Sequence, residues 1–306
     1  MNPGRPRPVR QVTEYPGRDV VRSLLLIAAA GALSALPSSA CTIFFAAKAG
    51  LVLAGNNEDI YLDKVPIVWV RPGGDAEHGR ITFGFEEPDG KVFAQGGVND
   101  AGLFFDAAVT PKVGKAQRRK ERAPENMGDA MLAECASVDE AVAWLEARDL
   151  RLLVGSHLLL GDKSGGKAVV ELIEGETKVI RSDKDYIAAT NFSFSKPEAG
   201  NYPCPRFDAV RLAFGGNEAP PIAVNVENFE AILESTAVPR TRIEDEQRDG
   251  GTLYSNIYDL TRGTIRLYRE SNWKHPVDMD VSEWLARGEQ TLLMDSLFRE
   301  VEAPRP

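Results

Sequence analysis

The sequence of 306 residues lacks the common catalytic templates, which directs attention to nucleophiles that act without a metal or a histidine. It contains no HExxH, CxxC, P-loop or GxSxG pattern, and its three histidines stand far apart. Its three cysteines, Cys41, Cys135 and Cys204, are too few and too scattered for a disulfide framework or a zinc site. We therefore ask whether one of these cysteines is a nucleophile, and expect no metal site.

Cys41 follows a segment that is typical of export signals. Residues 1–40 contain an arginine-bearing stretch that ends at Arg22, an apolar run at 24–36 and small residues at Ser38 and Ala40. The apolar run is shorter than the roughly 20 residues that a transmembrane helix needs. We predict that residues 1–40 are a signal peptide, that cleavage precedes Cys41, and that the mature protein is periplasmic or secreted without stable membrane insertion.

A cysteine at the start of a mature chain carries its own general base. The free α-amino group has an unperturbed pKa of about 7.7–8.0 and can accept the proton of the thiol. The alternative is a lipid-modified Cys41, because the cysteines of lipoproteins also follow apolar leaders. Against it, Ser38 stands where a lipoprotein signal favours a leucine-like residue, and the sequence after Cys41 opens directly into a predicted strand.

A β-hairpin is expected to position Cys41. Apolar runs at 42–47 and 51–54 flank a turn at 48–50, so Cys41 begins the first strand. The polar motif Gly55-Asn-Asn-Glu-Asp59 then ends the second strand. From that place a carboxylate can turn back toward the first residue of the partner strand.

The rest of the chain alternates between strand and helix patterns, without a linker or repeat that divides 41–306. Further strands are predicted at 65–70, 81–85, 92–95, 103–109, 157–160, 167–172, 177–180, 186–191, 252–258 and 264–268. Helices are predicted at 127–135, after the capping box that starts at Ser137, and at 207–214, 226–233 and 281–301. This order favours one α+β domain with two antiparallel sheets and helices outside.

The charge balance restricts the class of partner. The chain has a formal net charge of −9 at pH 7, and its arginine-rich segment 1–40 is predicted to be removed. An acidic mature protein argues against nucleic acid as its partner. A small-molecule substrate is therefore expected, and homo-oligomer formation is left open.

The motifs occur in an order that resembles the choloylglycine hydrolase, penicillin V acylase and acid ceramidase group of N-terminal-nucleophile (Ntn) hydrolases. They are Cys41-Thr42, Gly55-Asn-Asn-Glu-Asp59, Gly97-Val-Asn-Asp-Ala-Gly-Leu103, His157 with Asp162, Thr190-Asn191, Pro205-Arg206-Phe207 and Thr252-Leu-Tyr-Ser-Asn256. The resemblance covers nearly all of residues 41–306. It implies a four-layer αββα sandwich, with two antiparallel sheets between helical layers.

The resemblance also implies roles for individual residues. Cys41 is the nucleophile, and Asp59 resembles the carboxylate that holds the terminal amine and thiol in position. Asn191 resembles the side-chain donor of the oxyanion hole, with a backbone N–H near 107–109 as the second donor. Arg206 resembles the arginine that lies close to the nucleophile. Without the resemblance, Asn191 is equally an ordinary turn residue and Arg206 a surface residue at a helix start; no substrate-binding residue is assigned.

The implied reaction is hydrolysis of a linear amide bond in an N-acyl compound through a Cys41 thioester, with no metal or organic cofactor. Asn56 stands where bile salt hydrolases and many relatives carry arginine, which puts a bile-salt substrate in doubt. Asn99 is expected in a turn that shapes the site without being catalytic. Two alternatives stay open: an acyltransferase of the fungal penicillin-forming type, in which an amine replaces water, and a lipid-anchored binding protein with an inactive site.

Overall fold

The computed structural model describes residues 40–86, 90–115 and 121–302. The predicted signal peptide lies outside the described residues, apart from Ala40. Within the described ranges, no helix is both long and apolar enough to cross a membrane.

The first sheet has seven strands and contains the predicted hairpin at its centre. Its strand order is β12-β1-β2-β14-β15-β16, and β13 pairs with β14. The strands are β1 (Thr42–Lys48), β2 (Leu51–Tyr61), β12 (Tyr186–Ala189), β13 (Thr241–Ile243), β14 (Arg248–Asp259), β15 (Thr264–Arg269) and β16 (Val277–Asp280). All pairings in this sheet are antiparallel, as the sequence predicted.

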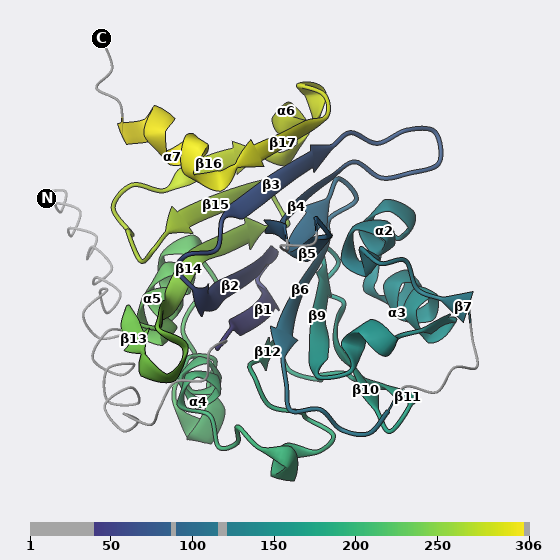
Figure 1. The fold of residues 1–306 in the computed structure, drawn as a ribbon, viewed down its shortest axis with the longest axis vertical. Helices are drawn as coiled ribbons and strands as arrows, with labels where there is room; N and C mark the ends of the chain where they lie inside the picture. Colours follow the sequence, from purple (N-terminus) through teal and green to yellow (C-terminus); the bar gives the residue numbers. More distant parts are fainter. Residues whose placement is uncertain (1–39, 87–89, 116–120, 303–306) are drawn as a thin grey trace, which may run out of the picture.

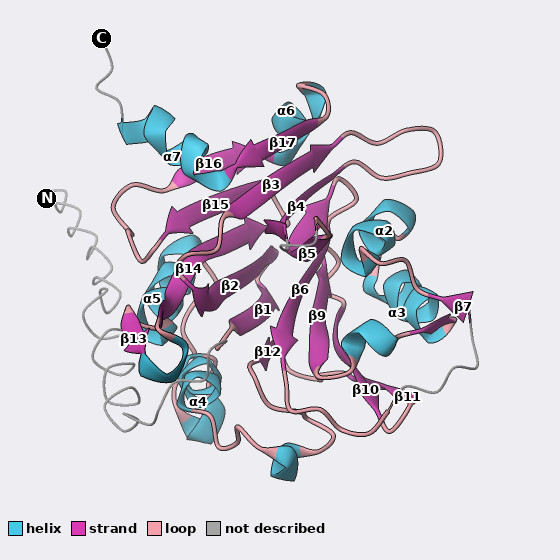
Figure 2. Ribbon diagram, viewed as in Figure 1, coloured by secondary structure: helices cyan, strands magenta, loops and turns pink. Residues whose placement is uncertain are grey.

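The second sheet has eight antiparallel strands in the order β11-β10-β9-β6-β5-β4-β3-β17. They are β3 (Pro66–Arg71), β4 (Arg80–Glu86), β5 (Val92–Asn99), β6 (Leu103–Val109), β9 (Ser156–Asp162), β10 (Lys167–Ile173), β11 (Glu176–Ile180) and β17 (Gln290–Leu293). A short parallel pair, β7 (Glu121–Arg122) and β8 (Arg148–Asp149), lies apart from both sheets. Figure 2 shows the two large sheets in magenta, with helices outside them.

Helices cover the outer face of each sheet (Figure 1). The helices α2 (Met127–Glu134) and α3 (Val138–Glu146) pack on the eight-stranded sheet, and α4 (Pro205–Ala213) and α5 (Val226–Thr236) pack on the seven-stranded sheet. The helices α6 (Val281–Ala286) and α7 (Met294–Glu302) contact strands of both sheets at one edge. Short 3₁₀ helices occur at Arg151–Leu153, Pro197–Ala199, Gly216–Glu218 and Glu244–Glu246.

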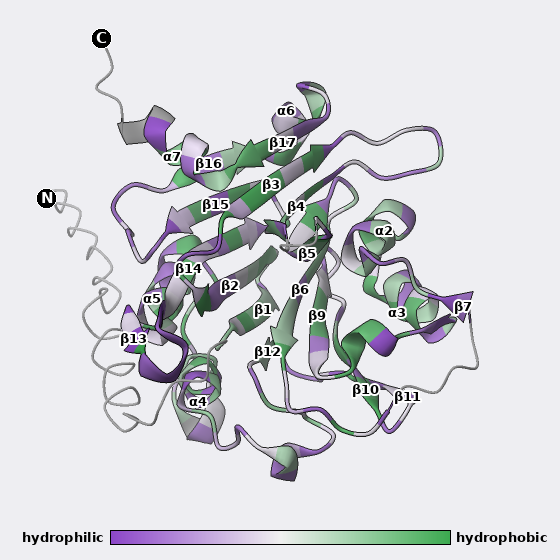
Figure 3. Cartoon of the chain, viewed as in Figure 1, coloured by the Kyte–Doolittle hydropathy of each residue, from purple (hydrophilic) through white to green (hydrophobic). Residues whose placement is uncertain are grey.

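Three apolar layers hold this arrangement together, as an αββα sandwich requires. The central layer lies between the sheets and includes Phe45, Phe83 and Phe104. A second layer joins the eight-stranded sheet to α2 and α3, and a third joins the seven-stranded sheet to α4 and α5. Figure 3 shows the hydrophobic residues concentrated along the central strands. The predicted four-layer fold class is confirmed.

The Gly55–Asp59 motif lies inside β2 instead of ending it, because β2 continues to Tyr61. Some of the polar side chains in this buried strand find hydrogen-bond partners on neighbouring elements, whereas both polar atoms of Asn56 have none among the described residues. Asn57 has such partners: its Nδ2 donates to Leu233 O at 3.0 Å, and its Oδ1 accepts from Ser255 Oγ at 2.7 Å. The motif therefore lies between β1 and β14, which both pair with β2.

The prediction of one helix over 281–301 is wrong. The chain there forms α6, then β17, then α7. Gly288 breaks the helical pattern, since its φ of +89° is left-handed and favours glycine. The following segment, Gln290–Leu293, pairs with β3 and covers the edge of that strand.

Candidate active site

The register of the first hairpin determines which residue faces Cys41. Lys48 pairs with Leu51 across the turn, and counting back along both strands puts Cys41 opposite Glu58. Directly opposite residues share a face of the sheet, and the Cys41 thiol and the Glu58 carboxyl are hydrogen-bonded. Both residues are 2% exposed. The candidate nucleophile therefore contacts a buried carboxyl group.

Asp59 follows Glu58 and therefore points to the other face of the sheet, toward α4. Its carboxyl accepts a hydrogen bond from Thr252 Oγ1, and its Oδ2 lies 3.8 Å from Arg206 Nη1. Burial raises the pKa of Asp59 to about 7, against the lowering effects of Arg206 and the Thr252 hydroxyl. This carboxyl group thus changes charge near neutral pH.

Arg206 connects the start of β1 with Asn191. Its Nη1 donates to Cys41 O at 2.6 Å, to Thr42 Oγ1 at 2.8 Å and to Ala40 O. Its Nη2 donates to Asn191 Oδ1 at 3.0 Å. Helix α4 begins one residue earlier with a proline, which suits this position because a first helical residue needs no N–H donor. The guanidinium therefore reaches Cys41 from the first turn of α4.

Asn191 comes close to Cys41 because it follows β12, which pairs with β1. Its Oδ1 accepts from Arg206, so its Nδ2 is directed away and donates to Val109 O at 2.9 Å. Asn201 Nδ2 in turn donates to Asn191 O at 2.8 Å. The amide nitrogen thus lies beside the end of β6, the segment in which we expected the second oxyanion donor.

Glu171 anchors the loop that follows Asn191. Its carboxyl accepts hydrogen bonds from Phe194 N at 2.7 Å and Ser195 N at 3.0 Å, and His157 Nδ1 lies 3.4 Å from its Oε1. Burial raises the pKa of Glu171, but these hydrogen bonds outweigh it and lower the pKa to about 2. His157, which the sequence motif singled out, therefore contacts the carboxyl group that anchors this loop.

Asp106 on β6 brings a third carboxyl group near the thiol from the second sheet. Burial, and then the charge of Asp59, raises the pKa of Glu58 to about 8, while the hydrogen bond with Cys41 lowers it. Burial, and then the charge of Glu58, raises the pKa of Asp106 well above its usual range. Both carboxyl groups therefore keep their protons far above the pH at which exposed ones lose them.

The Cys41 thiol needs a base before it can attack. Burial, followed by the charges of Glu58 and Asp59, raises its pKa well above the usual range. In the described chain Ala40 still precedes Cys41, and Ala40 N donates to Asp59 O at 3.0 Å. Removal of the residues before Cys41 would place a free α-amine next to the thiol.

A pocket of about 350 Å³ opens at Cys41 and Glu58. Most of its other walls are apolar, with Phe93, Phe105 and Leu158 among them. Glu125 and Asn126 are the polar residues at its α2 side. The pocket is therefore suited to an apolar group attached to the thiol.

The pocket exists because β5 and β6 separate. The two strands pair only from Gly96–Asp106 to Val98–Phe104. Beyond that point residues 92–94 of β5 pair only with β4, and residues 107–109 of β6 pair only with β9. The pocket lies in the resulting gap, and Asp106 stands where the strands part.

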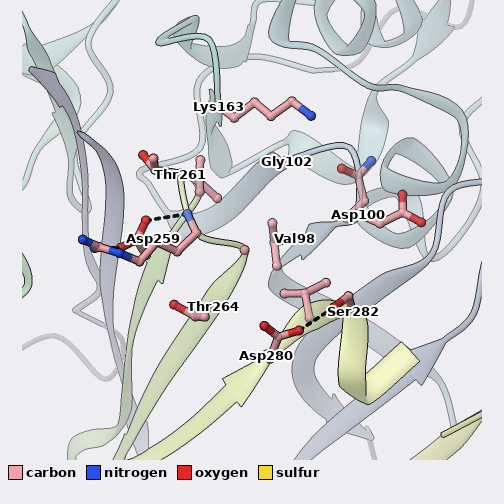
Figure 4. A pocket seen from close by; sticks show the side chains of 14 residues that line it. Val98, Asp100, Gly102, Lys163, Asp259, Thr261, Thr264, Asp280 and Ser282 are labelled. Carbon is pink, nitrogen blue, oxygen red and sulfur yellow. Dashed lines mark hydrogen bonds and ion pairs between the residues drawn. The ribbon is translucent and has the colours of Figure 1, made fainter. Parts of the chain in front are cut away.

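A second pocket, of about 250 Å³, lies at the opposite end of the strands (Figure 4). Lys163, Asp259 and Asp280 are among its lining residues. Asp259 already accepts from Arg262 N and Nη1, and Asp280 accepts from Ser282 Oγ. Neither of these carboxylates is without a partner, and the residues that line this pocket include no cysteine, so the Cys41 pocket is the candidate active site.

Asn99 lines the second pocket, so the expectation that it shapes the Cys41 site is wrong. It is the last residue of β5, at the end away from Cys41. Its Nδ2 donates to Leu132 O and Cys135 O, both at 2.7 Å, and its Oδ1 accepts from Leu103 N at 2.9 Å. Asn99 therefore joins the β5–β6 turn to the end of α2.

The structure thus brings together all four residues that the sequence singled out: Cys41, Asp59, Asn191 and Arg206. It adds Glu58 and Asp106, which the sequence analysis did not assign. Across the described part of the chain, no group of three or more histidine, cysteine, aspartate or glutamate side chains is arranged to hold a metal ion.

A protein-family model matches this chain. The model of the family described as acyl-coenzyme A:6-aminopenicillanic acid acyl-transferase matches residues 78–274. The matched segment contains Asn191 and Arg206 and begins after Cys41 and Asp59. Comparison with curated proteins found no match.

Solved structures of two enzymes resemble this fold. A mutant of conjugated bile acid hydrolase from Clostridium perfringens matches with a TM-score of 0.63 and 17% identity, over 83% of this chain and 96% of that chain. Penicillin V acylase from Agrobacterium tumefaciens matches with a TM-score of 0.63 and 19% identity, over 83% of this chain and 91% of that chain. At such identities the likeness shows the fold alone, and it agrees with the αββα sandwich.

Proposed function

The chain belongs to the acyl-coenzyme A:6-aminopenicillanic acid acyl-transferase family, and we propose that it is an exported Ntn hydrolase with Cys41 as nucleophile. Its reaction is hydrolysis of the linear amide bond of an N-acyl compound. The observation that carries this proposal is the convergence of Arg206 on Cys41 O and Asn191 Oδ1, beside a pocket that opens at the thiol.

The reaction follows from the positions of these groups. After the residues before Cys41 are removed, its α-amine takes the thiol proton and the sulfur attacks the amide carbonyl. Asn191 Nδ2 turns from Val109 O to the developing oxyanion, while Arg206 holds the amide by its Oδ1. The α-ammonium gives its proton to the leaving amine, and water then hydrolyses the thioester. Asp59 orients the amine, and the scheme uses no metal or organic cofactor.

The acyl part of the substrate belongs in the Cys41 pocket. After the amine leaves, the acyl group stays bonded to the sulfur, so it needs a site next to the thiol. The walls at Phe93, Phe105 and Leu158 provide such a site for an apolar group. Penicillin V acylase and conjugated bile acid hydrolase, which share the fold, bear names of amide-cleaving enzymes.

An acyltransferase is the second candidate, and the description of the family model favours it. In that reaction an amine attacks the Cys41 thioester in place of water. Incubation with an N-acyl substrate and an added amine acceptor separates the two activities. A free carboxylic acid as the main product supports the hydrolase, and a new amide as the main product supports the acyltransferase.

The test of this proposal combines analysis of the mature N-terminus with assays of amide cleavage. Intact-mass and N-terminal analysis of the exported protein should show an unmodified Cys41 as the first residue, and an S-diacylglyceryl cysteine would refute the mechanism. The processed protein is then assayed on N-acyl amides from phenoxyacetyl to long-chain acyl and bile-acid conjugates. Iodoacetamide should abolish amide cleavage in proportion to Cys41 labelling. Full activity in a processed Cys41→Ala protein would refute the assignment of the nucleophile.

A further inference from the structure

We propose that the acyl group of the substrate carries a protonated amine close to its carbonyl, and that Glu58, with Asp106 behind it, binds this ammonium group. This inference rests on the proposed function, because it places the acyl group in the Cys41 pocket. It makes the enzyme selective for aminoacyl amides.

The first argument is the position of Glu58. Its carboxyl contacts the Cys41 thiol and forms part of the pocket wall. In the acyl-enzyme the carbonyl carbon is bonded to that sulfur. A substituent on the α or β carbon of the acyl group therefore comes within reach of Glu58.

The second argument is that each of these two carboxyl groups has one oxygen without a partner. Glu58 Oε2 and Asp106 Oδ1 are buried side-chain atoms without a hydrogen-bond partner among the described residues. The two side chains belong to residues that are 2% and 1% exposed. Buried polar atoms are normally paired, so the unpartnered Glu58 oxygen at the pocket wall indicates a group that a ligand supplies, and Asp106 lies close to Glu58.

The third argument is charge. Within the described ranges, no lysine, arginine or histidine forms an ion pair with Glu58 or Asp106; Arg206 pairs with Asp59 on the other face of the sheet. Two buried carboxyl groups without a cation are costly to ionise, and burial accordingly raises the pKa of Glu58 to about 8. A bound ammonium supplies the missing positive charge and forms charge-assisted hydrogen bonds.

The same cation would favour the reaction. The pKa of the Cys41 thiol is raised mainly by burial, and the second largest cause is the charge of Glu58. An ammonium between the acyl carbonyl and Glu58 offsets that charge at the moment when the sulfur becomes negative. The remainder of the acyl group meets apolar walls such as Phe93, Phe105 and Met127.

The test compares amides that differ only in the amine. The substrates are phenylalanine p-nitroanilide, as both enantiomers, and 3-phenylpropanoyl p-nitroanilide, which lacks the α-amino group. The measured quantity is the ratio of kcat/KM for the better enantiomer to kcat/KM for the deaminated amide at pH 7. A site built to bind a polar group rejects the analogue that lacks it, so we expect a ratio of about 10² or more.

Variants identify the residues responsible. Glu58→Gln and Asp106→Asn keep the side-chain shapes and remove the charges, so each should lower the ratio by about tenfold or more. Glu176→Gln removes an exposed carboxylate on β11, which lies outside the Cys41 pocket and pairs with Lys178 at 2.6 Å, and should keep the ratio within about twofold. The first residue and the melting temperature of each processed variant are measured alongside.

The outcomes are distinct. Faster cleavage of the deaminated amide by the wild type overturns the aminoacyl proposal and leaves the amide hydrolase standing. A ratio that stays the same in both Glu58→Gln and Asp106→Asn also overturns it. If the processed protein cleaves none of these amides and none of the N-acyl amides in the wider panel, both proposals are refuted.

Discussion

Replacing Glu58 by glutamine should raise the free energy of unfolding at neutral pH. In the folded protein the pKa of Glu58 is raised, mainly by burial, from 4.5 to about 8. At pH 7 the unfolded chain has lost this proton, and folding must take it up again. Glutamine has nearly the same shape and needs no proton, so it avoids that cost.

The sign and size of the effect follow from the two pKa values. The folded state binds more protons than the unfolded state between pH 4.5 and about 8, so stability falls as pH rises through this window. At ~1.36 kcal/mol per pKa unit, the penalty is about 3 kcal/mol at pH 7 and under about 1 kcal/mol at pH 5. Glu58→Gln should therefore gain up to about 3 kcal/mol at pH 7 and much less at pH 5.

Urea unfolding of the processed proteins at pH 5, 6, 7 and 8 measures this difference. The stability of the wild type should fall relative to Glu58→Gln as pH rises. The control Glu176→Gln changes an exposed carboxyl on β11 and should follow the wild type. A Glu58→Gln protein no more stable than the wild type at pH 7, with the same pH dependence, would show that the Glu58 carboxyl is already satisfied and would refute the reasoning.

Three further predictions concern catalysis. Asn191→Ala should lower kcat by roughly 10²–10³-fold with little change in KM, because it removes an oxyanion donor; a rise in KM alone would make the residue structural. Asp59→Asn should lower kcat and remove the acid limb of the pH–rate profile, because a carboxyl with a pKa of about 7 must ionise to orient the protonated amine; an unchanged limb contradicts this role. Arg206→Gln should move that limb to higher pH, because burial raises the pKa of Asp59 and Arg206 opposes it; a limb at the same pH rules out this coupling. Melting temperatures of all three variants separate catalytic loss from unfolding.

The sequence allowed the hairpin and the general architecture to be predicted because they depend on local patterns. The apolar runs on either side of Ala49 and Gly50 define β1 and β2, and both turn residues have the positive φ that a tight turn requires. Helices α4 and α5 also lie where their periodicity indicated. The region after Val281 was predicted wrongly, because β17 exists only by pairing with β3, which is distant in sequence.

Glu58 was within reach of the sequence and was missed. Once the turn is placed at Ala49 and Gly50, counting back along the two strands pairs Cys41 with Glu58 and puts both side chains on one face. The family motif implied a role for Asp59 and none for its neighbour Glu58. The signal was therefore the register of the hairpin, which the length of the turn determines.

The sequence by itself determined the candidate nucleophile, the hairpin that carries it and the order of motifs that indicates the fold, because each depends on residues that are close along the chain. Only the tertiary structure decided how distant residues meet. Arg206 reaches Cys41 and Asn191 because α4 packs on the seven-stranded sheet. Asp106 comes near Glu58 because the two sheets stack face to face, and the pocket opens because β5 and β6 separate. Such contacts depend on the packing of whole layers, which no local pattern specifies.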